Sequence, residues 1–267
     1  MTQERPPVVI TGVGIVSPLG IGRVAFWDAL IAGRSGIRAA PPELMGTLPV
    51  MTAGQVDGFD PAEFIKPRKA IKLMCRESQL AFAAAMLAAQ DADLSNGASA
   101  ADRMGVLFGS QMFYGMVDEL APVFRSSIVD GSFSMPAWGR SFGREMFPLW
   151  LLNYLPNMPA CHIAIALQAL GPNNTIVQGD ASGLLALMEA TSVIQRGWAD
   201  VMLVGSVGSH LAVTREIHVS LDHISPRRDD VESACRPFDA ACDGTVLAEG
   251  AAAVVLESSA HAKARGA

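Results

Sequence analysis

Short, continuously apolar segments alternate with helix-like segments along this chain, and that alternation is the strongest constraint on its fold. Buried strands are predicted over residues 8–12, 104–109, 174–178, 200–205 and 251–256, and helices over 23–32, 69–92, 160–170 and 184–195. Residues 34–60 are predicted to be loop, and 125–150 show no clear period. Because strands covered on both faces are apolar throughout, the pattern predicts an α/β fold with a mostly parallel, mixed sheet and helices on both faces.

The predicted helix over 184–195 is apolar in nearly every direction around its axis. Its apolar residues are Leu184, Leu185, Ala186, Leu187, Met188, Ala190, Val193 and Ile194. A helix on the surface of a protein shows one apolar stripe, whereas a helix apolar all round is covered on all sides. Full burial of one large apolar side chain contributes roughly 1.5–3 kcal/mol. We therefore expect another layer, supplied by a second chain, to cover the face that points away from the sheet.

Composition excludes several classes of protein. The chain has 20 Lys and Arg against 26 Asp and Glu, a net charge of −6, which argues against a nucleic-acid partner. Hydrophobic residues make up 50% and charged residues 17%, which excludes disorder, and no apolar run reaches the ~18 residues of a membrane span. Four cysteines without metal-type spacing, and an N-terminus without a secretory signal, predict a reduced cytoplasmic protein without a metal site.

The glycine-rich stretch over 11–17 has only a weak similarity to a dinucleotide-binding motif. Ser17 stands in place of the third glycine, and no acidic residue ends a second strand ~20 residues later. We interpret the stretch as a tight turn after a strand and expect no cofactor.

A series of motifs along the whole chain gives a more specific indication. They are TGVGIVSPLG at 11–20, GPNNT at 171–175, ASG at 181–183, ADVMLVG at 199–205, CRPFD at 235–239, DG at 243–244 and AEGA at 248–251. Together they resemble, in order and spacing, the β-ketoacyl synthases, the condensing enzymes of fatty-acid and polyketide assembly. The resemblance implies the N-terminal half of a thiolase-like fold, as one domain over 1–267 with the C-terminal half absent.

The chain departs from that family at the nucleophile. Family members have a cysteine directly before the Ala-Ser-Gly segment, and here the position holds Asp180. The two histidines and the glycine-rich oxyanion loop of the family belong to the second half. The five histidines present are interpreted as ordinary surface or core residues: His162, His210, His218, His223 and His261. Cys161 and His162 are adjacent on a predicted helix and point about 100° apart, so no Cys–His pair is expected.

An aspartate does not replace the cysteine chemically. Its carboxylate is a weaker nucleophile, its attack on a thioester would give a reactive mixed anhydride, and its charge would repel a malonyl group. We therefore expect Asp180 to be inactive in condensation. The interpretation that we favour is that Asp180 caps the N-terminus of the following helix, a role for which Asp is well suited.

Two further groups of residues are candidates for binding. The resemblance places Met112 and Phe113 in the loop that lines the acyl pocket, where they would bind substrate; core packing is the alternative. Lys69, Lys72 and Arg76 fall on one face of the predicted helix. They could dock an acidic acyl carrier protein, or they form an ordinary solvated face.

These observations favour a non-catalytic subunit that pairs with an active condensing enzyme and shapes its acyl pocket, as chain-length factors do. The strand over 174–178 would supply the pairing edge of a homodimer or heterodimer, because the family dimerises through the similar strand. The alternatives are a β-ketoacyl-[acyl-carrier-protein] synthase whose second half comes from another chain, and a fragment of a longer synthase.

Overall fold

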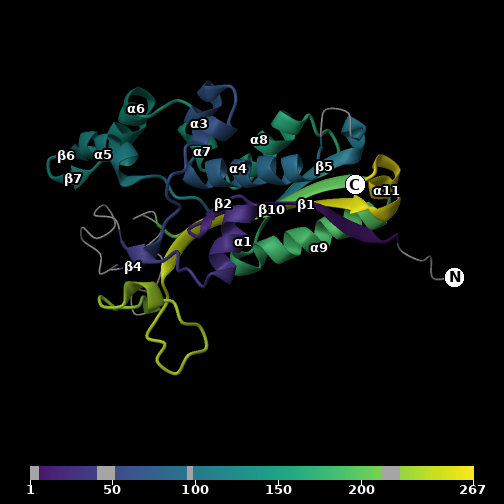
Figure 1. Cartoon of the computed structure of the whole chain (residues 1–267). Coiled ribbons are helices and arrows are strands. Elements are labelled where there is room, and N and C mark those ends of the chain that lie inside the picture. Colours follow the sequence, from purple (N-terminus) through teal and green to yellow (C-terminus); the bar gives the residue numbers. More distant parts are fainter. Residues whose placement is uncertain (1–5, 41–51, 95–98, 212–222) are drawn as a thin grey trace.

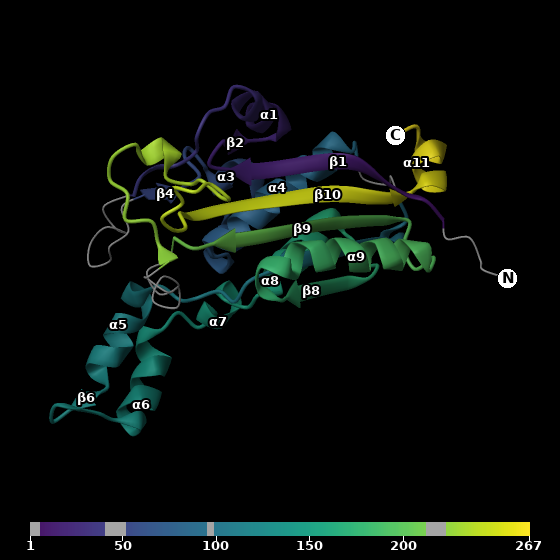
Figure 2. The ribbon, with the colours of Figure 1, turned by 90° about the horizontal axis from the view of Figure 1, so that it is seen from below.

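A six-strand path of a mixed sheet forms the centre of the molecule (Figure 2). The computed structural model describes residues 6–40, 52–94, 99–211 and 223–267. The strands follow one another across the sheet in the order β2 (Gly20–Ile21), β1 (Val8–Ser17), β10 (Leu247–Ser258), β9 (Val201–Ser209), β5 (Met104–Ser110) and β8 (Asn173–Val177). Strands β9, β5 and β8 are parallel, while β10 runs antiparallel to both β9 and β1. The predicted α/β fold with a mostly parallel mixed sheet is confirmed.

The central strands are buried because helices lie on both faces, as their apolar sequences predicted. All seven residues of β5 are buried, as are the first five of β9. Gly205 of β9 lies under the ring of Phe108, and a Cβ there would meet that ring and come within 2.6 Å of the Ala252 carbonyl oxygen. The glycine therefore lets a large aromatic side chain of β5 cross the neighbouring strand.

Two helices cover one face of the sheet, α4 (Arg76–Asp91) and α8 (Met158–Leu167) (Figure 1). Helix α4 presents a row of buried alanines to β1. Gly12 and Gly14 of β1 lie so close to the backbone of α4 that a Cβ on either would overlap its carbonyl oxygens. Small residues on both sides thus bring the helix and the strand together.

The helix predicted over 69–92 is in fact two elements, which corrects the sequence prediction. A 3₁₀ helix, η1 (Arg68–Leu73), precedes α4, and Met74 and Cys75 between them are extended. The extended pair breaks the helical register, so residues before and after it do not share one helix face.

Two other helices lie on the opposite face, α1 (Arg23–Ile31) and α9 (Ser182–Gln195). Ala186, Ala190 and Ile194 of α9 are buried against the sheet, whereas Leu184 and Met188 are 71% and 65% exposed. The described part of the chain therefore leaves the far side of this helix uncovered, as its all-round apolar sequence predicted.

An arm projects from the body of the molecule where the sequence shows no clear period (Figure 2). It consists of α5 (Val117–Ser126), a two-stranded hairpin of β6 (Ile128–Val129) and β7 (Ser132–Phe133), and α6 (Met135–Glu145). Phe124, Phe133, Trp138 and Phe142 form its aromatic cluster, with ring centroids 4.7–6.3 Å apart. Pro122 inside α5 and two glycines inside α6 are unfavourable in helices, so the sequence analysis assigned no helix here.

Short elements complete the fold. They are β3 (Arg38–Ala39), β4 (Thr52–Gly54), α3 (Pro61–Phe64), η2 (Ala101–Arg103), α7 (Trp150–Asn153), η3 (Gly179–Ala181), η5 (Val231–Ser233) and α11 (Ser259–Arg265). The segment predicted as loop over 34–60 contains β3 and β4, and residues 41–51 lie outside the described residues.

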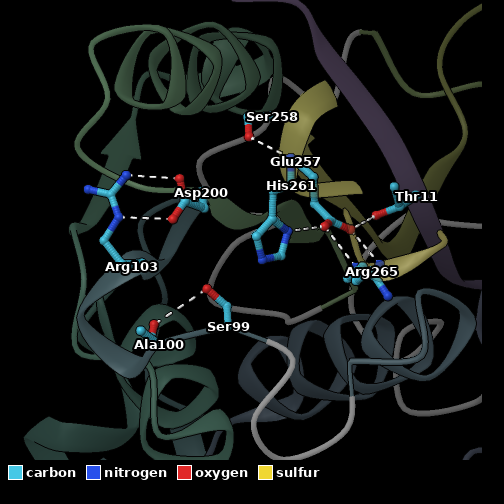
Figure 3. A network of polar contacts seen from close by, with 9 residues as sticks. All are labelled: Thr11, Ser99, Ala100, Arg103, Asp200, Glu257, Ser258, His261 and Arg265. Carbon is cyan, nitrogen blue, oxygen red and sulfur yellow. Dashed lines mark hydrogen bonds and ion pairs between the residues drawn. The ribbon is translucent and has the colours of Figure 1, made fainter. Parts of the chain in front are cut away.

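A buried carboxylate attaches the last helix to the sheet (Figure 3). Glu257 of β10 is fully buried and accepts hydrogen bonds from Arg265 and from Thr11 of β1; its second oxygen lies 2.6 Å from Nδ1 of His261. Burial by itself raises the pKa of Glu257, but the hydrogen bonds from Arg265, Thr11 and His261 outweigh it and hold the pKa at about 2. A second ion pair joins Arg103 to Asp200 at 2.9 Å.

Candidate functional site

A sharp turn joins the edge strand β8 to the start of α9, and Asp180 lies in this turn. Gly179 has φ of +57°, which a residue with a side chain rarely adopts. The buried Ser182 closes the turn: its hydroxyl oxygen accepts from the Gln178 amide at 2.7 Å and donates to the Gly179 carbonyl at 2.7 Å. The chain direction therefore reverses within four residues.

The start of α9 is pressed against two strands of the sheet. A Cβ on Gly109 of β5 would lie 2.5 Å from the Ser182 carbonyl carbon and 2.6 Å from the Gly183 nitrogen. A Cβ on Gly183 would lie 2.8 Å from that of Ser206 in β9. Because these two glycines have no side chain, the start of α9 can lie in direct contact with the ends of β5 and β9.

Asp180 is exposed on the outer side of this turn. The prediction that it caps α9 is wrong, because the N-cap residue is Ala181 and no side chain makes the capping hydrogen bond. Ser182 makes the hydrogen bonds that close the turn, which leaves the carboxylate of Asp180 without a partner among the described residues. The side chain is thus presented to solvent near the positive end of a helix.

Met112 and Phe113 lie directly after β5 but point to different surroundings. Phe113 is 5% exposed and belongs to the main core, whereas Met112 is 55% exposed. The structure therefore separates the two residues that the sequence grouped together: one packs in the core, and one is free to contact a ligand or a partner.

Lys69, Lys72 and Arg76 do not form one basic face. Lys69 and Lys72 are exposed on η1, whereas Arg76 lies across the break at the start of α4. The Arg76 guanidinium donates to both carboxylate oxygens of the buried Glu249, at 2.8 and 3.2 Å, and lies 4.9 Å from the centre of the Phe59 ring. Arg76 is therefore committed to an internal ion pair.

The charge around Lys72 is mixed. This lysine lines a cavity of about 600 Å³ together with Asp118, Glu119 and Glu145. Glu119 accepts hydrogen bonds from the Trp150 indole and the Tyr154 hydroxyl, at 2.9 and 2.6 Å. Burial and the bond to Glu119 raise the pKa of Tyr154, so this hydroxyl stays protonated.

The surroundings of Cys75 and Cys161 do not suit a catalytic thiolate paired with a histidine. Burial and the neighbouring Glu77 raise the pKa of the Cys75 thiol to about 12. Cys161 and His162 interact with different partners: the thiol with Asn157 and the imidazole with the Leu73 carbonyl oxygen at 3.3 Å. The expectation that these two residues form no catalytic pair agrees with this geometry.

One polar pair near the turn was missed by the sequence analysis. Nε2 of Gln111 lies 3.1 Å from Nε2 of His210, so the pair joins the ends of β5 and β9. The two residues are 99 positions apart, and no motif or spacing signals their contact. His218 lies outside the described residues.

The described residues hold no group of three or more His, Cys, Asp or Glu side chains arranged for a metal ion. Within the same residues, every helix is too short or too polar to cross a membrane.

Comparison with known proteins identifies what this fold resembles. The family model for the β-ketoacyl synthase N-terminal domain matches residues 5–262. The 3-oxoacyl-[acyl-carrier-protein] synthase 2 of Staphylococcus aureus strain COL is 34% identical over the whole chain, and that of Coxiella burnetii is 33% identical over 99% of it. In both cases the chain spans 61% of the length of the relative.

Solved structures show the same likeness in three dimensions. A β-ketoacyl synthase from Burkholderia phymatum matches 98% of this chain with a TM-score of 0.80 and 32% identity. The ishigamide ketosynthase/chain length factor matches 98% with a TM-score of 0.80 and 26% identity. A type II ketosynthase in complex with its acyl carrier protein, bound to a hexaketide, matches 99% with a TM-score of 0.75 and 28% identity. The chain covers 61% of each of these three structures, and the thiolase-like fold is confirmed.

Proposed function

The chain belongs to the family of β-ketoacyl synthase N-terminal domains, and from that premise we propose that it is a non-catalytic subunit of fatty-acid or polyketide assembly. In this proposal it pairs with an active synthase and shapes the acyl pocket of that enzyme, as a chain-length factor does. A structural relative at 26% identity is itself described as a ketosynthase/chain length factor.

The observation that carries the proposal is Asp180. It occupies the turn after β8 where the family resemblance requires the nucleophilic cysteine. An exposed carboxylate at this turn is a poor nucleophile toward a thioester, and none of the described residues hydrogen-bonds it as a general base or orienting group would. The absence of the nucleophile from a domain that otherwise matches the family supports a role in assembly and shaping.

Uncovered apolar surface supports pairing with a condensing-enzyme subunit. Leu184 and Met188 of α9 are exposed beside a groove of about 650 Å³, which also borders β8. Strand β8 has a neighbour, β5, on one side only among the described strands. An unpaired edge strand beside an apolar helix face is suited to a homodimer or a heterodimer.

Acyl carrier protein is the second partner that we propose. Lys69 and Lys72 are exposed cations on η1 that an acidic partner can reach, and Arg76 leaves this set because it is paired with Glu249. The charge-reversal pair Lys69→Glu and Lys72→Glu should weaken carrier-protein binding without lowering stability. Unchanged binding would remove these lysines from the docking surface.

The chain spans 61% of the length of its relatives. The alternative function is therefore that of a synthase whose remaining part lies on another or a longer polypeptide. Light scattering on the chain alone and with the products of neighbouring genes separates the two functions. The subunit proposal expects aggregation alone and a defined complex with one intact synthase. A monodisperse monomer alone would contradict it, as would condensation activity that is lost on Asp180→Asn.

A complementary experiment restores the nucleophile. If only the thiol is missing, Asp180→Cys in the complex would add a second active site, and labelling with a thioester substrate would double. If the chain serves only to shape the pocket, labelling stays on the partner. Doubled labelling would support the enzyme alternative.

A further inference from the structure

The side-chain contact between Gln111 and His210 connects the residues that follow β5 and β9. Besides the 3.1 Å side-chain contact, the backbone of His210 donates to the Ala248 carbonyl oxygen of β10 at 3.0 Å. The imidazole is therefore held by a backbone that is itself tied to the neighbouring strand. The contact with His210 thus holds the side chain of Gln111 in place. Gln111 itself begins an irregular segment, because residues 111–116 form no helix or strand.

The surroundings leave little room for another arrangement of the Gln111 side chain. It lies across Gly208 of β9, where a Cβ would come within 3.2 Å of the amide nitrogen and 3.4 Å of the amide carbon. A residue larger than glycine would force the amide to move. The backbone of Gln111 itself is held as well, because the buried Ser110 donates to the Gln111 carbonyl oxygen at 3.1 Å.

The pair lies on the same face of the sheet as the start of α9. Side chains alternate between faces along a strand, and Gly109 and Ser206 contact Ser182 and Gly183 of α9. Gly208 of β9 therefore lies one two-residue step, about 7 Å, nearer the carboxyl edge on that face, and the Gln111 side chain lies across it. The pair thus lies beyond the carboxyl ends of β5 and β9, on the side of the sheet where α9 begins.

Met112 is the residue whose position depends on this anchor. It follows Gln111 directly and is 55% exposed. On its other side, Phe113 is fixed in the core. We propose that His210 is a positioning residue that, through Gln111, fixes Met112 and so sets the length of acyl chain that the complex accepts. This inference rests on the proposed function, together with the family resemblance that places Met112 in the loop lining the acyl pocket.

Hydrogen exchange tests the anchor without any partner. His210→Ala and Gln111→Ala should each raise amide exchange across residues 111–116 about fivefold, the factor that corresponds to one hydrogen bond of about 1 kcal/mol. Gly208→Ala should do the same by displacing the amide. His210→Gln, whose amide oxygen can accept from Gln111, should restore most of the protection. His223→Ala is the matched control, because His223 is an exposed histidine that takes no part in this contact.

The product distribution of the reconstituted complex with its synthase tests the consequence. With His210→Ala the range of acyl-chain lengths should broaden, with Met112→Ala it should shift to longer chains, and with His210→Gln and His223→Ala it should match that of the unmodified chain. Thermal unfolding of each variant shows whether it is folded.

The two measurements separate the ways in which the inference can fail. Unchanged exchange over 111–116 in a folded His210→Ala variant would overturn the anchor, whatever the chain does with a partner. Raised exchange with an unchanged product range would overturn the role in chain length. If the unmodified chain has no effect on any synthase, the proposed function and the role in chain length are both lost, while the exchange result still decides the anchor.

Discussion

At the scale of single residues, the turn that holds Asp180 depends on glycines that allow backbones to touch. The Cβ of an alanine at Gly109 would meet backbone atoms of Ser182 and Gly183, and these atoms cannot rotate away as a side chain would. We expect Gly109→Ala to lower the free energy of unfolding by about 2–3 kcal/mol, at the upper end of overpacking costs.

Urea unfolding measures this effect, and Gly139→Ala is its control. Gly139 lies inside α6, and no atom lies within 4 Å of the position that an alanine methyl group would take there. Alanine at this position should stabilise the helix by up to about 1 kcal/mol. Equal effects of the two substitutions would show that the close approach of α9 does not limit stability.

Glu257 gives a second prediction at this scale, because its pKa is shifted by folding. Its folded pKa of about 2 is below the ~4.3 of an unfolded glutamate, so its stabilising contribution is complete above pH ~4.3. As the pH falls from 4.3 toward 2, roughly 3 kcal/mol should be lost.

Glu257→Gln should therefore destabilise the protein at pH 7 and flatten the dependence on pH between 4.3 and 2. Urea melts at pH 7 and at pH 3 measure both effects. The exposed Glu63 is the control, and Glu63→Gln should leave the pH dependence unchanged. An equally steep acid loss in Glu257→Gln would assign that loss to other carboxylates.

Residue-level predictions from the sequence failed for two different reasons. Asp180 has the right chemistry for a cap, but the neighbouring Ser182 makes the bonds that close the turn. Arg76 has the right charge for docking, but the buried Glu249, 173 positions away, binds its guanidinium. Local sequence contains no information about a partner at such a distance.

At the scale of elements, α9 packs against the rest of the described chain through one side only. Leu184→Gln with Met188→Gln changes only its exposed side, so the free energy of unfolding should stay within about 0.5 kcal/mol. Aggregation of the isolated chain should fall and complex formation should be lost, as light scattering would show. In contrast, Ala190→Gln introduces a larger polar side chain at a fully buried position and should unfold the chain.

Continuously apolar strands were predictable, and the helices of the projecting arm were not. Strands β5 and β9 are apolar throughout because both faces are covered, and this pattern identified them. The α5–α6 arm packs against itself through an aromatic cluster, with Pro122 inside one helix and glycines inside the other. The apolar residues of the arm pack into this local cluster and not against the sheet. A search for helices that cover a sheet therefore does not detect them.

At the scale of the whole molecule, helices cover one face of the sheet and leave part of the other face open. Helices α4 and α8 cover the first, whereas a shallow apolar hollow of about 370 Å³ lies open on β1, β9 and β10 near α1, with Phe26 at its side. Gly208, Gly250 and Ala252 line this hollow, and such small residues allow close approach of another element. Together with α9, this surface is where a second layer would contribute to stability.

The final prediction concerns that second layer. A partner that binds only the folded chain stabilises it by RT ln(1 + [L]/Kd), about 2.7 kcal/mol at a partner concentration of 100 times Kd. For a chain of 267 residues this corresponds to a rise in Tm of roughly 5–10 °C. Thermal unfolding followed by calorimetry at several concentrations of the partner synthase should show Tm rising with concentration. The Leu184→Gln, Met188→Gln variant should keep its own Tm and show no such rise, since it lacks the surface that the partner covers. A rise of equal size in that variant would place the interface elsewhere on the molecule and would contradict the role of α9.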